Sequence, residues 1–169
     1  MRIVKYVLVA ACSAVVLIGC GGKEEKKKAG FSYEKKEEVV KEVKNNSNDV
    51  VITGNDAMQF SKKEIRVKAG EKVKITLKHI GKMDKNVMGH NFVLLKQGVS
   101  LSAFGNKAAA AKASQYIPEN GKDVIAHTDI VGAGETSIVE FDAPAPGTYE
   151  FLCSFPGHYA MMKGTFIVE

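Results

Sequence analysis

One cysteine, two histidines and one methionine are placed in the chain so that they could bind a single metal ion. Cys153, His158 and Met162 lie within a stretch of ten residues near the C-terminus, and His90 follows Gly89 earlier in the chain. A thiolate and two imidazole nitrogens, with a weakly bound thioether sulfur, suit copper in both of its oxidation states. The pattern therefore predicts a mononuclear copper site of the kind that transfers electrons.

Other kinds of site compete with this interpretation. Cys153 and His158 could be the nucleophile and the base of a hydrolase. Such pairs usually come from distant segments, however, and the sequence supplies no orienting carboxylate. A structural zinc site would favour several cysteines, and Met162 could be a core residue, which is the commonest role of methionine. Copper binding is the better interpretation because all four ligands occur together.

The residues around these ligands predict strands that end at one pole of a sheet. Thr148–Cys153 and Gly164–Val168 are rich in β-forming residues and predict two paired strands. The loop between them carries the cysteine, the second histidine and the methionine. A further strand is expected at Asn91–Leu95, directly after His90, so that this histidine could reach the same pole.

Short alternating runs elsewhere predict an all-β domain. They occur at Val50–Thr53, Glu64–Val67, Lys72–His79 and Thr136–Phe141. Regular short strands separated by glycine or asparagine turns are typical of a Greek-key β-sandwich or barrel. One segment is different, because residues 101–115 contain four consecutive alanines and are followed by Pro118, which predicts a helix.

From residue 49 to residue 169 the chain resembles the azurins, which are bacterial cupredoxins. The segments that carry the resemblance are, in order, Thr53–Phe60, Asn86–Asn91, Val124–Thr128 and Cys153–Gly164. The resemblance implies a cupredoxin-like sandwich with one helical flap. It also implies copper bound by His90, Cys153 and His158, with Met162 as a distant axial ligand. The backbone carbonyl of Gly89 would face the metal from the opposite side, where a side chain would crowd it.

The resemblance also assigns residues that surround the ligands. It implies that Asn91 and Phe155 tie the two ligand loops together and donate backbone N–H groups toward the cysteine sulfur. The family spacing selects Met162, rather than its neighbour Met161, as the axial ligand. Redox partners would dock on an apolar patch around an exposed His158. The patch consists of Met58, Met83, Val87, Met88, Pro156, Ala160 and Met161.

The chain departs from the family in two places. Asn48 and Gly70 occupy the positions of a family disulfide, so that bond is expected to be absent. Phe92 stands where some azurins have a buried tryptophan, and this chain contains no tryptophan. Neither departure affects the metal ligands. Of the two remaining histidines, we expect His79 to be partly buried near the site and His127 to lie at the surface.

The N-terminus predicts export and lipidation. Residues 1–19 combine a short positive region with an apolar run too short for a comfortable membrane span, which is typical of a signal peptide. Leu17–Cys20 resembles a lipobox, so we expect Cys20 to carry acyl chains that anchor the protein in a membrane. A plain secretory signal with an incidental cysteine is the alternative. Position 21 is a glycine and not the aspartate that retains some lipoproteins at the inner membrane. This favours the outer membrane, at the periplasmic face of a bacterial envelope, as the location.

Residues 20–48 are predicted to form a charged, flexible tether, because they are rich in lysine and glutamate and poor in apolar residues. The whole chain has a formal net charge of +5. Its lysines are scattered without interleaved aromatic residues, so the sequence gives no support for nucleic-acid binding. Of the three cysteines, Cys12 leaves with the signal, Cys20 carries lipid and Cys153 binds copper, so no intramolecular disulfide is expected.

These features predict a membrane-tethered protein that passes single electrons between redox proteins such as cytochromes, copper reductases or peroxidases. The domain is expected to be monomeric. A copper enzyme would need a second metal centre, commonly built from histidines beside the copper cysteine, but Leu152 and Ser154 flank Cys153. A copper-binding or copper-scavenging lipoprotein without a role in electron transfer is the remaining alternative, although scavenging favours exposed methionine or histidine clusters.

Overall fold

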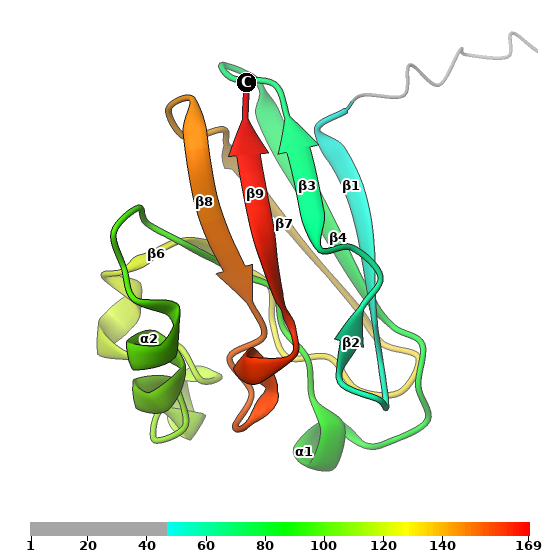
Figure 1. Ribbon diagram of the computed structural model, residues 1–169. Coiled ribbons are helices and arrows are strands. Elements are labelled where there is room, and N and C mark those ends of the chain that lie inside the picture. The colour runs from blue at the N-terminus through cyan, green and yellow to red at the C-terminus, as the bar shows by residue number, and fades with distance from the viewer. Residues whose placement is uncertain (1–46) are drawn as a thin grey trace, which may run out of the picture. The chain divides into compact units, whose positions relative to one another are not determined.

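Two β-sheets packed against each other make up the folded part of the protein. The computed structural model describes residues 47–169. One sheet has the strand order β2-β1-β4-β7 and the other has the order β3-β9-β8-β5-β6 (Figure 1). The strands are β1 (Asp49–Asn55), β2 (Gln59–Phe60), β3 (Glu64–Val67), β4 (Lys72–His79), β5 (Val93–Leu95), β6 (Val124–His127), β7 (Thr136–Asp142), β8 (Gly147–Leu152) and β9 (Lys163–Val168). The predicted all-β sandwich is therefore confirmed.

The core lies between the sheets and follows from the alternating pattern of the strands. In β3, Ile65 and Val67 are buried while the residues before each of them are exposed. Strand β4 buries Val73, Ile75 and Leu77 in the same alternation, although Thr76 between the last two is buried as well. The aromatic rings of Phe151 and Phe166 fill the space from the other sheet. Burial of each such side chain stabilises the fold by roughly 1.5–3 kcal/mol. The two strands predicted at 64–67 and 72–79 have the predicted bounds.

Helix α2 (Leu101–Ala108) covers a second, smaller cluster of apolar residues at one side of the sandwich. Ser100 caps its N-terminus, because the Ser100 hydroxyl accepts a hydrogen bond from the Ala103 N–H. The predicted helix, 101–115, was too long. Beyond Ala108 the alanines have no apolar surface to pack on, and short helices depend on such packing. The chain instead forms a single 3-10 turn at Lys112–Ser114.

The segment that carries the first histidine also differs from expectation. The strand predicted at Asn91–Leu95 begins only at Val93, because the N–H of Phe92 donates to the Thr128 hydroxyl instead of joining a strand ladder. His90 forms an isolated bridge with Val131. The sequence did not predict helix α1 (Lys85–Met88), which is too short to produce an apolar period.

Asn48, which the sequence assigned to the tether, belongs to the folded domain. Only 1% of Asn48 is exposed. Its side-chain oxygen accepts a hydrogen bond of 2.8 Å from the Lys68 N–H, and its amide donates one of 3.0 Å to the Lys68 carbonyl. The start of β1 is thus tied to the segment after β3, close to where the resemblance placed a disulfide.

The loops that carry the predicted ligands lie at one end of the sandwich. The connection between β8 and β9, helix α1 and strand β2 are all at this end, and the C-terminus is at the other (Figure 1). We call this end the ligand pole. In residues 47–169 no helix is long and apolar enough to span a membrane. The predicted signal peptide, Cys20 and the tether up to residue 46 lie outside the described residues.

Candidate metal centre

The β8–β9 hairpin holds three of the predicted ligands in one loop. Cys153 directly follows β8 and Met162 directly precedes β9, and the Cys153 N–H donates to the Met162 carbonyl at 2.9 Å. Between them Gly157 adopts a left-handed φ of +82°, a conformation that glycine accepts readily. A 3-10 turn follows at His158–Ala160, and the Met162 N–H donates to the His158 carbonyl at 2.8 Å. The loop is therefore closed by its own backbone.

His90 is held rigidly from three directions. Its backbone exchanges two hydrogen bonds with Val131, of 2.9 and 2.8 Å. Its Nε2 lies 3.0 Å from the Asn55 carbonyl, and since a carbonyl only accepts, Nε2 carries the proton. The ring stacks on His79 with the centroids 4.6 Å apart and the planes at 13°. The unprotonated Nδ1 is thus left to face Cys153.

The three donor atoms have the separations that a single metal ion requires. Cys153 Sγ lies 3.9 Å from Nδ1 of His90 and 3.7 Å from Nδ1 of His158. One ligand atom from each of the three buried residues lies within 4.8 Å of the other two. For bonds of about 2.0 Å to nitrogen and 2.3 Å to sulfur, as in zinc sites, an angle of 120° places the two atoms about 3.7 Å apart. The residues therefore fit a trigonally bound metal, and the soft thiolate with two imidazoles fits copper.

Burial controls the protonation of the donors. It raises the pKa of the Cys153 thiol to about 12, although the backbone N–H groups of Asn91 and Phe155 point at the sulfur and oppose that rise. Burial also lowers the pKa of His158 to about 4 and lowers the pKa of His90. Both imidazoles are therefore neutral near pH 7, with lone pairs ready for a metal, whereas the thiol must lose a proton.

Asn91 links the two ligand loops through its side chain. Its Oδ1 accepts hydrogen bonds from the N–H of Ser154 at 2.8 Å and from the Ser154 hydroxyl at 3.2 Å. Its Nδ2 lies 2.8 Å from the same hydroxyl and 3.4 Å from the Gln115 carbonyl. The ring of Phe155 lies 4.7 Å from that of His158. Asn91 and Phe155 therefore both lie beside the donors, one in the polar network and the other against a ligand ring.

The remaining candidate ligands are also at the ligand pole. Met162 is fully buried, whereas its neighbour Met161 is 50% exposed. The carbonyl of Gly89 lies 3.9 Å from Cys153 Sγ. A Cβ at Gly89 would overlap the Lys85 carbonyl oxygen and would lie 2.9 Å from the Phe155 ring. The position therefore has no room for a side chain.

The predicted apolar patch is exposed in part. Met83, Val87 and Met161 are 44%, 65% and 50% exposed; Pro156 and Ala160 are exposed, and Met58 and Met88 are half-buried. His158, expected to be an exposed ring, is only 4% exposed, because Phe155 and the loop pack over it.

One edge of the His158 ring still reaches the surface. Its Nε2 makes no hydrogen bond within residues 47–169. In the same range, no buried side-chain nitrogen or oxygen lacks a hydrogen-bond partner. Nε2 must therefore be accessible to solvent.

The structure also shows contacts that sequence reasoning did not identify. The Asn55 carbonyl sets the tautomer of His90, and no residue type could signal a backbone contact. Gln115 and Tyr116 adopt left-handed φ angles of 54° and 62° beside the ligand loops, but neither is a residue type that predicts this conformation. His79 is buried against His90, and His127 is exposed.

A β-sandwich with a buried cysteine, two histidines and a methionine at one pole defines the class of small copper proteins. Comparison with known sequences agrees: the profile described as "Copper binding proteins, plastocyanin/azurin family" matches residues 46–169. The chain belongs to this family. Its centre is a type 1 copper site formed by His90, Cys153, His158 and Met162.

Individual relatives are similar over the same domain. Azurin-1 of Alcaligenes xylosoxydans xylosoxydans is 49% identical over 119 residues, which cover 68% of this chain and 92% of that protein. Azurin of Bordetella pertussis is 45% identical over 120 residues, covering 69% of this chain and 80% of that protein. Among solved structures, an azurin from Methylomonas sp. strain J has a TM-score of 0.66 at 34% identity, covering 72% of this chain and 97% of that one. Dithionite-reduced auracyanin from Roseiflexus castenholzii has a TM-score of 0.65 at 33% identity, with the same coverage.

Proposed function

We propose that this protein is a lipid-anchored carrier that passes single electrons between redox proteins at the periplasmic face of a bacterial cell envelope. It is a carrier and not an enzyme, as its family membership indicates. Copper in this ligand set supplies the chemistry by cycling between Cu(I) and Cu(II). The observation that carries the proposal is the buried Cys153 sulfur, with Nδ1 of His90 and His158 at 3.9 and 3.7 Å.

Rigid donors support a role in electron transfer. His90 is fixed by Asn55 and by the stacked ring of His79. Cys153 is fixed by its own backbone bond to Met162 and by two N–H groups at its sulfur. Donors that cannot move keep one geometry in both oxidation states, so little reorganisation accompanies each transfer. A scavenger would gain nothing from such rigidity, because it must take up and release its metal.

The surface over His158 supports a route for the electron. Only the edge of the His158 ring reaches solvent, and exposed apolar side chains, including Met161 and Val87, lie at the same pole. We propose that the patch defined above is where redox partners dock and that electrons cross at the His158 edge. Methionine side chains adapt to different partner surfaces, and small, weakly held contacts suit a carrier that must release each partner quickly.

Electron self-exchange tests the carrier function and its route together. Met161→Lys and Met88→Lys should keep the blue absorption. They should slow self-exchange by about tenfold or more, because like charges brought face to face in a contact cost several kcal/mol. Ile138→Lys is the matched control: Ile138 is also an exposed apolar residue, at 54%, but it lies within strand β7 and is not part of a ligand loop or of the patch. NMR line broadening in mixtures of oxidised and reduced protein measures the rate. Equal rates in all three fully copper-loaded variants would refute the route.

Lipidation needs a separate test, because Cys20 lies outside the described residues. Cys20→Ser should release the protein from the membrane fraction or leave it unprocessed, since the serine hydroxyl cannot form the thioether. Labelling of cells with a radioactive fatty acid measures this directly. Label retained on the Cys20→Ser protein would refute the anchor and leave the copper site unaffected.

A further inference from the structure

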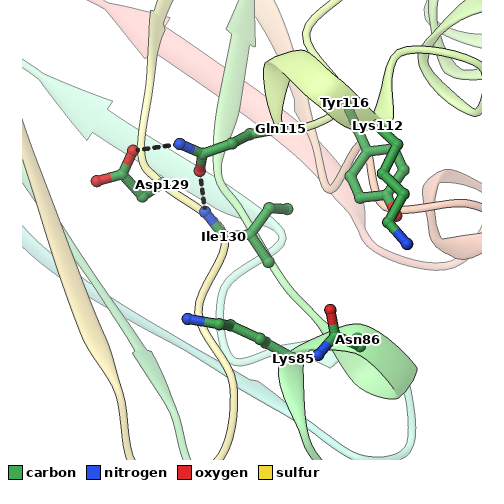
Figure 2. Close-up of a pocket in the computed structure, with 7 residues that line it drawn as sticks. All are labelled: Lys85, Asn86, Lys112, Gln115, Tyr116, Asp129 and Ile130. Carbon is green, nitrogen blue, oxygen red and sulfur yellow. Dashed lines mark hydrogen bonds between the residues drawn. The ribbon is translucent and has the colours of Figure 1, made fainter.

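A polar pocket lies beside the copper site and is not part of it. Its volume is about 340 Å³, and it opens between helix α1, the turn after α2 and the segment before Val131. Lys85 and Asn86 line it from α1, while Lys112 and Tyr116 line it from the turn (Figure 2). None of these side chains is a copper ligand, and the pocket has no role in the function proposed above.

The wall of this pocket is built at a conformational cost. Gln115 and Tyr116 are consecutive non-glycine residues with left-handed φ angles of 54° and 62°. Chains avoid this conformation unless the surroundings impose it. The Gln115 amide holds the opposite segment, because its oxygen accepts from the Ile130 N–H at 2.9 Å and its nitrogen donates to Asp129 at 3.1 Å (Figure 2). The pocket is therefore a fixed feature of the fold.

The pocket is one residue away from the copper ligands. The Tyr116 ring meets the Phe155 ring edge-on at 5.2 Å, and Phe155 in turn contacts His158. Helix α1 joins the pocket to the apolar patch, since Lys85 and Asn86 face the pocket while the next residue, Val87, is 65% exposed. A partner that covers the patch would therefore place the edge of its contact surface over the pocket.

The lysines at the pocket favour the binding of an acidic group. Lys112 forms no ion pair with any of the residues 47–169. Lys85 pairs with Glu135 at 3.5 Å, but both side chains are about half exposed, and such pairs are worth little. Asp129 also lines the pocket and keeps its negative charge while it accepts from Gln115, but its carboxylate lies on the side of the pocket away from Lys112 in Figure 2. Two lysines can thus turn toward an incoming carboxylate.

We propose that this pocket receives an acidic surface loop of the redox partner, with its carboxylates held by Lys85 and Lys112 while the apolar patch makes the central contact. The proposal rests on the proposed function of electron transfer between proteins. An apolar centre with a charged rim gives a contact that forms fast and in one orientation. The partner is therefore identified by its chemistry, as a redox protein with acidic side chains beside its electron-transfer surface.

A tetraglutamate peptide serves as the probe for this chemistry. It is titrated into the full-length, copper-loaded, reduced protein, and amide shifts are followed by nitrogen-15 NMR. Shifts should gather at the amides of α1 and of Gln115. Lys85→Gln and Lys112→Gln should each weaken binding about two- to fivefold, the range expected for an exposed ion pair. Lys68→Gln, which removes the same charge after β3 at the other end of the sandwich, should leave binding unchanged.

Shifts outside the pocket, or equal binding by all variants, would overturn the proposal. Inorganic phosphate binding as tightly as the peptide would make the pocket a site for free anions, which also overturns it. Electron self-exchange of the wild-type protein distinguishes a failure of the acidic-partner proposal from a failure of the proposed carrier function. A normal self-exchange rate without peptide binding would refute only the acidic partner. The absence of self-exchange would refute the proposed carrier function itself.

Discussion

Replacement of Asn91 by alanine should reveal how far one buried side chain holds the copper site together. Asn91 and Ser154 are 0% and 1% exposed, and the Asn91 amide makes three hydrogen bonds to Ser154, of 2.8, 3.2 and 2.8 Å, across the two ligand loops. Alanine would leave the Ser154 N–H and hydroxyl without these partners in a place that water does not reach. The substitution also removes the bond to the Gln115 carbonyl.

The expected loss of stability follows from these contacts. An unsatisfied buried N–H costs about 1–3 kcal/mol, and a lost bond to the hydroxyl costs about 0.5–1.5 kcal/mol. Asn91→Ala should therefore lower the free energy of unfolding by about 2–4 kcal/mol, a large part of the roughly 5–15 kcal/mol typical of a domain. Asn106→Ala is the matched control, because Asn106 is exposed and its side chain accepts one hydrogen bond, from the Tyr159 hydroxyl at 2.8 Å. It should cost only about 0.5 kcal/mol.

Urea unfolding of the copper-free proteins measures this difference without a contribution from metal affinity. A second measurement is the reduction potential of the copper-loaded proteins. The Asn91 N–H points at the Cys153 sulfur, and a looser loop would weaken this donation and lower the potential. If Asn91→Ala costs no more stability than Asn106→Ala, the amide does not join the loops as argued.

Three further predictions concern the ligands themselves. Cys153→Ser should abolish the intense blue absorption, because an alcohol cannot supply the thiolate-to-copper charge transfer; a remaining blue band would exclude Cys153 as the ligand. Met162→Leu should keep the colour and raise the reduction potential, because a weak donor to Cu(II) is lost, whereas Met161→Leu at the surface should change it little; the reverse order would refute the axial assignment. Finally, burial lowers the pKa of His158 from 6.5 to about 4, so the unfolded chain takes up a proton first as the pH falls. The copper-free protein should thus lose stability between pH 6.5 and 4. Urea unfolding measures the loss, which His158→Asn should reduce, and an equal loss in this variant would assign it to other groups.

The sequence predicts the site well because its chemistry is compressed into one loop. Few kinds of site use a cysteine, a histidine and a methionine together, and the spacing of Cys153, His158 and Met162 fits the connection of a β-hairpin. Strand alternation predicts the frame for the same reason, since a residue such as Ile65 can only face the core when its neighbours face water. Both signals are local, so they can be read without knowing the fold.

What the sequence does not predict depends on contacts between distant segments. The Asn55 carbonyl that sets the tautomer of His90 is a backbone group, which any residue would supply. Helix α2 stops where its apolar support ends, although the alanines beyond favour a helix. The left-handed turn at Gln115 is imposed by its bonds to the 129–130 segment. These features form only when distant segments of the chain pack together in the folded domain.

Burial links the protonation of the free site to the potential of the loaded one. With two neutral imidazoles and one thiolate, Cu(II) leaves one net positive charge in the site, and Cu(I) leaves none. The environment that lowers the pKa of His158 to about 4 also disfavours the net charge of the oxidised site, since in both cases a cation loses its hydration. The packing of Phe155 against His158 therefore does two things at once: it keeps the imidazole free to bind metal, and it favours the reduced form. The apolar patch extends this effect during docking, because a partner that covers the His158 edge removes the last water from the ligands and raises the tendency of the site to accept an electron.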